Sequence, residues 1–169
     1  AIRKKLFVPI PKNVLLDDVV IPMSIICQGY RCVFDEGAMA YDLPNTDHRA
    51  ESVRKRRTLT GNLQMAILFP RWLLPWENPI WAQYISHKLA RLLTPFLCVF
   101  IFGCSAFLAR DSFFAGCVFL QGVFYGLAGI AWVFQKRGFS LIGFGFPMAF
   151  LIFNWAILAA WMDALRGRF

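Results

Sequence analysis

The hydrophobic and polar positions divide the chain into two unlike parts that meet near Gly61. Before this residue apolar and polar residues are mixed, and after it apolar residues dominate. Three long apolar runs, 92–109, 113–134 and 139–161, contain no Lys, Arg, Asp or Glu. Each is close to the roughly 20 residues that a helix needs to cross the hydrocarbon of a bilayer. The pattern therefore predicts a transmembrane region over 92–169 with three spans.

The mixed part, residues 1–61, begins with one clear helix signal. Asp17 or Asp18 is a favourable N-cap for a helix that runs towards Gln28 and Gly29. The apolar positions between them recur at helical spacing, which predicts one buried face.

A second helix is expected to begin at Thr46 or Asp47 and to continue to about Leu68. Glu51 and Lys55 are spaced i, i+4 and would support it as an ion pair. This helix carries a run of consecutive basic residues up to the boundary between the two parts.

Short stretches rich in β-branched and aromatic residues, or bounded by turn residues, lie at 1–7, 30–34 and 38–41. Such stretches are typical of strands. Together with the two helices they predict an α/β fragment over residues 1–61.

Residues 62–91 predict short amphipathic helices that lie in the headgroup layer. Prolines interrupt this segment, and Trp and Tyr are interleaved with Arg, Glu, His and Lys, a mixture that suits a membrane interface. The residues concerned are Pro70, Pro75, Pro79, Trp72, Trp76, Trp81, Tyr84, Arg71, Glu77, His87 and Lys88.

Composition favours a membrane protein. Hydrophobic residues make up 58% of the chain, above the roughly 45–50% of a soluble domain. The net charge is +8 at pH 7, and the basic residues of the second part flank the apolar runs. We therefore favour a lipid bilayer over nucleic acid as the partner. The five cysteines form no CxxC pair, so no zinc or disulfide framework is expected.

The loop charges predict an orientation in the membrane. His87, Lys88 and Arg91 precede the first span, and Lys136 and Arg137 separate the second from the third. Positive charges favour the cytoplasmic side, so both groups are expected there. The C-terminus would then lie on the opposite side.

Asp17 and Asp18 are the first candidates for chemistry. One interpretation is an N-cap pair. The other is a general base, because a carboxylate at a helix start can take a proton from an attacking hydroxyl. One Asp can cap while the other reacts, so the two interpretations are compatible.

The basic run Arg54, Lys55, Arg56 and Arg57 is the second candidate. It can be a solvated face or a contact to anionic lipid headgroups. It can also bind a diphosphate, since the planar guanidinium pairs with phosphate oxygens at two points. Arg54 and Arg57 share one helical face. Lys55 and Arg56 point elsewhere and are expected to meet water or headgroups.

Taken in order, several phrases resemble the C-terminal half of a membrane-bound family 2 glycosyltransferase. Residues 1–4 resemble the "AxRR" phrase, Asp17 and Asp18 the "ED" or "DD", and residues 29–31 the "GYR" phrase. Residues 86–95 resemble "SHKxxRxxxP". The chain begins without Met, inside such a phrase, and we expect it to be a fragment.

The basic run resembles the family's "QxxRW" region with its trailing Gly. When Gly61 is placed on that Gly, Arg57 falls on the motif Arg, Arg54 on the Gln and Thr58 on the Trp. The Gln and Trp are typical of processive polysaccharide synthases. Their replacement leaves open whether transfer is processive or single.

The resemblance implies a GT-A-like α/β domain at the cytoplasmic side of a membrane, here the bacterial inner membrane. It implies inverting transfer from a nucleotide-sugar to a carbohydrate or lipid-linked acceptor. Asp18 would be the general base and Asp17 would orient it. Arg57, with Arg54, would bind the diphosphate or the acceptor.

The resemblance also implies a divalent metal, Mg or Mn. The family's metal-binding DxD is not in this chain, so metal and nucleotide would be bound mainly by residues outside it. The chain alone is then expected to be inactive.

A different class of protein is compatible with the same residues. A non-enzymatic membrane protein could use the basic helix to bind anionic lipid or a partner. The two hypotheses differ in the role that they give to Asp18.

Overall fold

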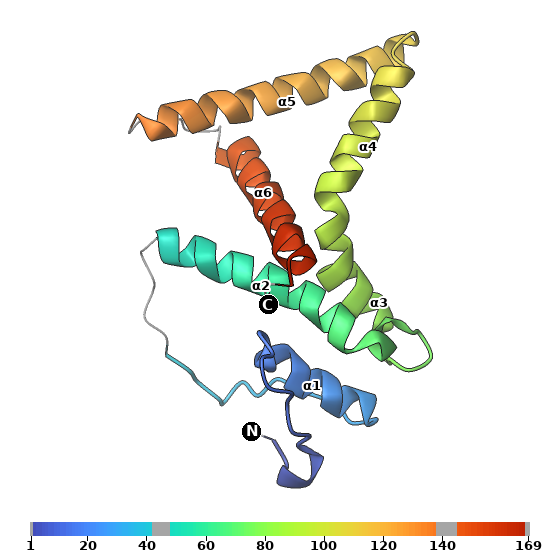
Figure 1. Cartoon of the computed structure of the whole chain (residues 1–169), viewed down its shortest axis with the longest axis vertical. Helices are drawn as coiled ribbons and strands as arrows, with labels where there is room; N and C mark the ends of the chain where they lie inside the picture. The colour runs from blue at the N-terminus through green and yellow to red at the C-terminus, as the bar shows by residue number, and fades with distance from the viewer. Residues whose placement is uncertain (1, 42–47, 138–144, 168–169) are drawn as a thin grey trace. The chain divides into compact units, whose positions relative to one another are not determined.

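The computed structural model describes residues 2–41, 48–137 and 145–167, and within this part of the chain regular structure is entirely helical (Figure 1). The elements in chain order are η1 (Lys4–Leu6), α1 (Asp17–Cys27), α2 (His48–Leu68), η2 (Pro70–Leu73), α3 (Trp81–Tyr84), η3 (Ile85–Leu89), η4 (Ala90–Leu93), α4 (Thr94–Phe107), α5 (Ser112–Lys136) and α6 (Gly145–Leu165).

The prediction of an α/β fragment is wrong, because no strand is present among the described residues. Stretches 30–34 and 38–41 have no regular structure, and residues 2–7 contain only η1. Their side chains are strongly exposed, with Phe34 at 90% and Tyr41 at 89%. An isolated short strand is not stable in water without neighbours to pair with. β-propensity alone was therefore not sufficient here.

The first helix, α1, is confirmed, but its capping is not as predicted. Its N-cap is Leu16, without a side-chain hydrogen bond, so Asp17 and Asp18 lie in the first turn. Acidic residues there are favourable because they face the positive end of the helix dipole. Gly29 has φ 84°, and its N–H reaches the carbonyl of Ile26. A left-handed Gly in this position is a common helix stop.

The second helix, α2, ends at Leu68 as predicted. Its expected first residues, Thr46 and Asp47, lie outside the described residues, as does the Glu51 side chain that was to pair with Lys55. Residues 59–65 are buried on every face of the helix. The centre of α2 is thus surrounded by other parts of the chain.

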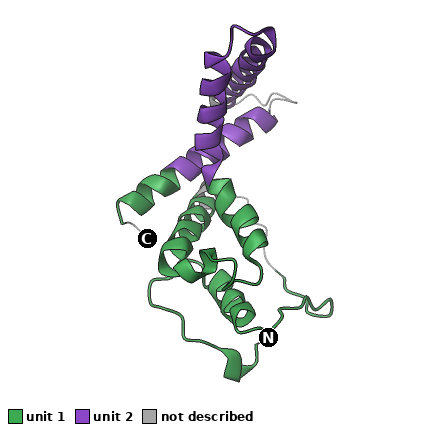
Figure 2. Ribbon diagram, turned by 90° about the vertical axis from the view of Figure 1, so that its right-hand side faces the viewer, with its two compact units in different colours: residues 1–92, 159–169 green, residues 93–158 purple. Residues whose placement is uncertain are grey.

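The chain forms two compact units, which Figure 2 colours separately. Unit 1 comprises residues 1–92 and 159–169, so it contains α1, α2 and the end of α6. Unit 2 comprises residues 93–158. The hydrophobic core of unit 1 joins α1 and α2 to the aromatic segment after α2, through Leu16, Val20, Met23, Met65, Trp72 and Tyr84.

Three helical segments are long and apolar enough to cross a membrane: Trp81–Phe107, Ser112–Gln135 and Gly145–Leu165. The prediction of three membrane-length helices is confirmed. The first begins at Trp81 rather than at Leu92, because the helix continues through η3 and η4. The predicted start of the third, at 139–144, lies outside the described residues. The placement of 62–91 in the headgroup layer stays a prediction.

Unit 2 has the surface of a protein that faces lipid. In the short connection between α4 and α5, Asp111 Oδ1 accepts a hydrogen bond from the N–H of Phe113 at 2.8 Å and caps α5. Large apolar side chains along the helices are exposed, for example Phe119 at 73% and Trp155 at 73%. Aqueous exposure of this extent would be unfavourable, and a bilayer removes that cost.

Candidate functional site

The candidate carboxylates, Asp17 and Asp18, are both exposed at the start of α1. Neither caps the helix, and neither has a hydrogen-bond or ion-pair partner among the described residues. Both are therefore available to an incoming group. The segment that fixes their position is loop 13–16, which leads directly into α1.

Loop 13–16 is attached to α2 by three hydrogen bonds, which two side chains of α2, Gln64 and Arg57, provide. The Gln64 amide binds it at two points: Oε1 accepts from the N–H of Leu15 at 2.9 Å, and Nε2 donates to the carbonyl of Asn13 at 2.8 Å. Arg57 Nη2 donates to the carbonyl of Leu15 at 3.2 Å. Thus both polar groups of the Leu15 backbone are bound by α2.

Gly61 lies between these two side chains on the same face of α2. A Cβ at this position would lie 2.5 Å from Cγ of Leu16 and 3.3 Å from Cβ of Leu15. No side chain fits there without displacing the loop. The glycine therefore allows α2 to approach the start of α1 closely.

Side chains of the basic run contact two different segments of unit 1. Arg57 reaches loop 13–16, as described, and Thr58 Oγ1 donates to the carbonyl of Arg54 one turn earlier. Arg56 instead forms an ion pair with Asp163 on α6 at 2.6 Å. Arg56 was expected to meet water or headgroups; its side chain is 51% exposed, and the ion pair with Asp163 is an additional contact that was not predicted. Hydrogen bonding to Asp163 raises the pKa of Arg56.

The structure joins Arg57 to loop 13–16, which leads into the first turn of α1 with Asp17 and Asp18. Arg54 is exposed one turn before Arg57, and no contact joins it to loop 13–16. Arg57 has five N–H donors, so its bond to Leu15 leaves others for a ligand. The site therefore combines an exposed carboxylate pair with a cation that is bonded to the loop preceding it.

Sequence reasoning missed Gln64, Asn13 and Asp163. Gln64 lies within an apolar stretch of α2, and a buried polar side chain there needs a partner. The sequence therefore indicated that Gln64 binds something, but it did not indicate that the partner is loop 13–16. Asp163 was treated only as the end of the third span, since its contact with α2 crosses 107 residues of sequence.

A metal does not fit the described residues. No group of three His, Cys, Asp or Glu side chains lies close enough to hold one, and Asp17 and Asp18 alone provide two carboxylates. Divalent cations in proteins usually require more oxygen ligands than this.

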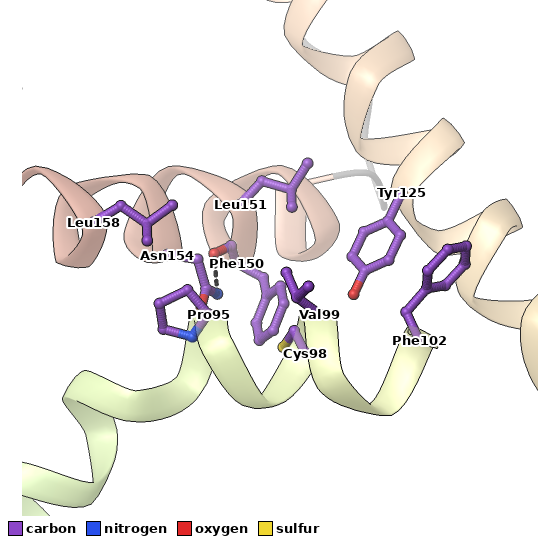
Figure 3. A pocket seen from close by; sticks show the side chains of 9 residues that line it. All are labelled: Pro95, Cys98, Val99, Phe102, Tyr125, Phe150, Leu151, Asn154 and Leu158. Carbon is purple, nitrogen blue, oxygen red and sulfur yellow. Dashed lines mark hydrogen bonds between the residues drawn. The ribbon is translucent and has the colours of Figure 1, made fainter. Parts of the chain in front are cut away.

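Unit 2 contains two apolar hollows, of about 290 and 670 Å³. Figure 3 shows the first, where side chains from α4, α5 and α6 meet, among them Cys98, Tyr125 and Asn154. Asn154 Nδ2 donates to the carbonyl of Phe150 at 2.8 Å, within its own helix. The remaining lining residues are apolar, apart from the thiol of Cys98 and the hydroxyl of Tyr125.

Comparison with known proteins finds no family model that matches this chain, no characterised protein similar to it and no similar solved structure. The site must therefore be interpreted from its own geometry.

Proposed function

We propose that this chain is the acceptor-side part and membrane anchor of an inverting glycosyltransferase of family 2. The reaction transfers a sugar from a nucleotide-sugar to a carbohydrate or a lipid-linked acceptor. The observation that carries the proposal is the bond from Arg57 to the Leu15 carbonyl. This bond supports a site in which a cation lies beside Asp17 and Asp18.

In the proposed mechanism Asp18 is the general base. Its carboxylate takes the proton of the acceptor hydroxyl while the acceptor oxygen attacks the anomeric carbon, and the bond to the diphosphate breaks. Asp17 orients Asp18. Exposure of both carboxylates supports this role, since an acceptor must reach them.

Arg57 has the electrostatic role. Negative charge grows on the leaving diphosphate, and a guanidinium fixed before the reaction stabilises it. Arg54 lies on the same helical face, one turn earlier, and would extend the contact to a second phosphate or to the acceptor. The attachment of Arg57 to loop 13–16 supports this assignment because it limits the freedom of the side chain.

In this proposal Mg or Mn is bound outside the described residues, which offer no suitable set of ligands. No step here is assigned to the metal. The anchor lies in a lipid bilayer, which the three apolar helices fit. We further propose the bacterial inner membrane, with Asp18 on the cytoplasmic side.

The test is Asp18→Asn in the full-length protein, assayed for sugar transfer in membranes from cells that express it. A panel of UDP-, GDP- and dTDP-sugars serves as donors. Loss of a general base should lower transfer by at least about 100-fold. Asp35→Asn is the matched control, because Asp35 is also exposed and its carboxylate accepts a hydrogen bond from the nearby N–H of Gly37.

Membrane insertion is measured in the same samples by alkaline extraction. Asp18→Asn should insert normally, since the substitution lies outside the apolar helices. Near-normal transfer by Asp18→Asn would exclude the assignment of the base. It would favour the alternative, a non-enzymatic membrane protein whose basic helix binds anionic lipid or a partner.

A further inference from the structure

Gln64 makes a contact that the proposed chemistry does not use. Its side chain is only 4% exposed, yet the groups that it binds belong to loop 13–16 at the exposed start of α1. The amide uses its acceptor on Leu15 and its donor on Asn13. One planar group therefore fixes both the position and the orientation of this short piece of backbone.

The loop would not hold this shape by itself. Asn13 has φ 75°, in the left-handed region that non-glycine residues seldom adopt. Asn tolerates this region better than most residues do, but the conformation still needs external support. The Gln64 bond to the Asn13 carbonyl provides it, at the residue where the backbone is least favourable.

The position of the Asp pair follows from the same bonds. Leu15 is two residues before Asp17, the first residue of α1. In the first turn of α1, the N–H groups of Val19 and Val20 donate to the Leu16 carbonyl. Because that turn is helical, little freedom remains between Leu15 and Asp18. Arg57 lies on the same face of α2 and donates to the Leu15 carbonyl, which belongs to the next peptide unit.

We infer that Gln64 is a positioning residue, which sets the place of Asp17 and Asp18 relative to Arg57 by holding loop 13–16. This inference rests on the proposed function for its effect on turnover. Its structural part, the attachment of the loop, does not depend on that function. The two parts can therefore be measured separately.

The experiment uses Gln64→Leu, which keeps a similar volume but removes both hydrogen bonds. Hydrogen–deuterium exchange of the peptide that contains Leu15 is measured in the intact protein in detergent. Exchange of the Leu15 amide should accelerate roughly tenfold, because its acceptor is lost. Exchange in α6 should not change. Unchanged protection of Leu15 would overturn the inference.

Transfer is measured on the same variant. A displaced base should lower kcat by about 10- to 100-fold, while the KM for the donor sugar changes little. A merely destabilising substitution would instead reduce the amount of folded protein without changing kcat per folded molecule. An unchanged kcat with a loosened loop would also overturn the positioning role.

Two further variants complete the test. Gln64→Glu keeps an acceptor for Leu15 but places an oxygen against the Asn13 carbonyl, so its effect should be intermediate, and it remains informative if Gln64→Leu does not fold. Gln28→Leu is the matched control, because Gln28 also donates to two carbonyls, those of Leu6 and Ser24, but does not contact loop 13–16. It should leave both exchange at Leu15 and kcat unchanged.

The outcomes separate the two proposals. If Asp18→Asn leaves transfer unchanged, the proposed function fails, whatever the exchange of Leu15 shows. If Asp18→Asn abolishes transfer while Gln64→Leu behaves like Gln28→Leu, only the positioning role fails.

Discussion

Arg56 on α2 forms a two-point ion pair with Asp163 near the end of α6. Nε of Arg56 lies 2.6 Å from Oδ2 of Asp163, and Nη2 lies 2.6 Å from Oδ1. The next residue, Arg57, binds the Leu15 carbonyl instead. Two adjacent arginines thus connect one helix to the end of a membrane-length helix and to the start of α1.

Breaking this pair should destabilise unit 1. The Asp163 side chain is 13% exposed and that of Arg56 is 51% exposed. The stability that this ion pair provides should therefore lie between that of a surface pair and that of a buried pair. We expect Arg56→Ala to cost about 1–2 kcal/mol, because it removes a two-point ion pair from a carboxylate that is only 13% exposed. The melting temperature in detergent should fall by about 2–8 °C.

The control for this prediction is Arg71→Ala. Arg71 pairs with Glu77 at 3.5 Å, but both side chains are well exposed, at 82% and 37%, so its loss should cost less than about 1 kcal/mol. The exchanged pair Arg56→Asp with Asp163→Arg should recover part of the stability lost in Arg56→Ala. Equal effects of Arg56→Ala and Arg71→Ala would contradict the structural role of the pair.

The end of α6 also bears on the topology of the membrane part. Trp161 Nε1 donates to the carbonyl of Leu92 at 2.9 Å, within unit 1. This bond and the Arg56 pair place the last turns of α6 beside residues that precede α4. Three complete crossings would put those two places on opposite sides of a bilayer. From these contacts we expect the segment that precedes α4 and the end of α6 to lie on the same side of the bilayer.

Labelling with a membrane-impermeant maleimide tests this topology. In a variant without native cysteines, Lys12→Cys and Arg166→Cys should react from the same side of sealed vesicles. The distribution of loop charges predicted the opposite arrangement, with the C-terminus on the far side. Reaction from opposite sides would support that charge-based orientation and exclude the contacts of Trp161 and Asp163 in the membrane.

Helix ends and membrane-length helices were predicted correctly, although the N-cap of α1 was not. Gly29 ends α1, and α2 ends at Leu68, before Pro70. The apolar runs predicted membrane-length helices, because length and composition alone decide whether a helix can cross hydrocarbon. These features depend on local chemistry, which the sequence contains directly.

Features that depend on distant partners were not predicted. The stretches around Phe34 and Tyr41 have strand-like composition but no strand to pair with among the described residues. Arg56 was expected in water or at headgroups because Asp163 is 107 residues away. The Asp pair and the basic run were both chosen as candidates, but the bonds of Gln64 that hold the first against α2 were not foreseen.

Gly61→Ala should loosen the contact between α2 and loop 13–16. The added Cβ would meet Cγ of Leu16 at 2.5 Å, and Leu16 is only 7% exposed, so it has little room to move. Overpacking of this kind costs about 1–3 kcal/mol. The measurement is the melting temperature, with Gly103→Ala on α4 as control, since nothing lies within 4 Å of a Cβ there. Equal stability of the two variants would contradict the close approach at Gly61.

The basic run should bind a diphosphate through Arg57 more than through Lys55. Arg57 is bonded to Leu15 in the loop that precedes the Asp pair, whereas Lys55 lies on a different face of α2. Loss of a guanidinium that contacts phosphate should weaken binding by about 10-fold or more, since charge-assisted hydrogen bonds contribute about 1.5–3 kcal/mol. Titration with UDP and GDP, in membranes from cells expressing each variant, measures the change. Arg57→Ala should raise the Kd strongly and Lys55→Ala only slightly. The alternative result is that both substitutions change the Kd for UDP and GDP by the same small amount and both weaken binding to vesicles of anionic lipid. That result would identify the basic run as a contact to lipid headgroups.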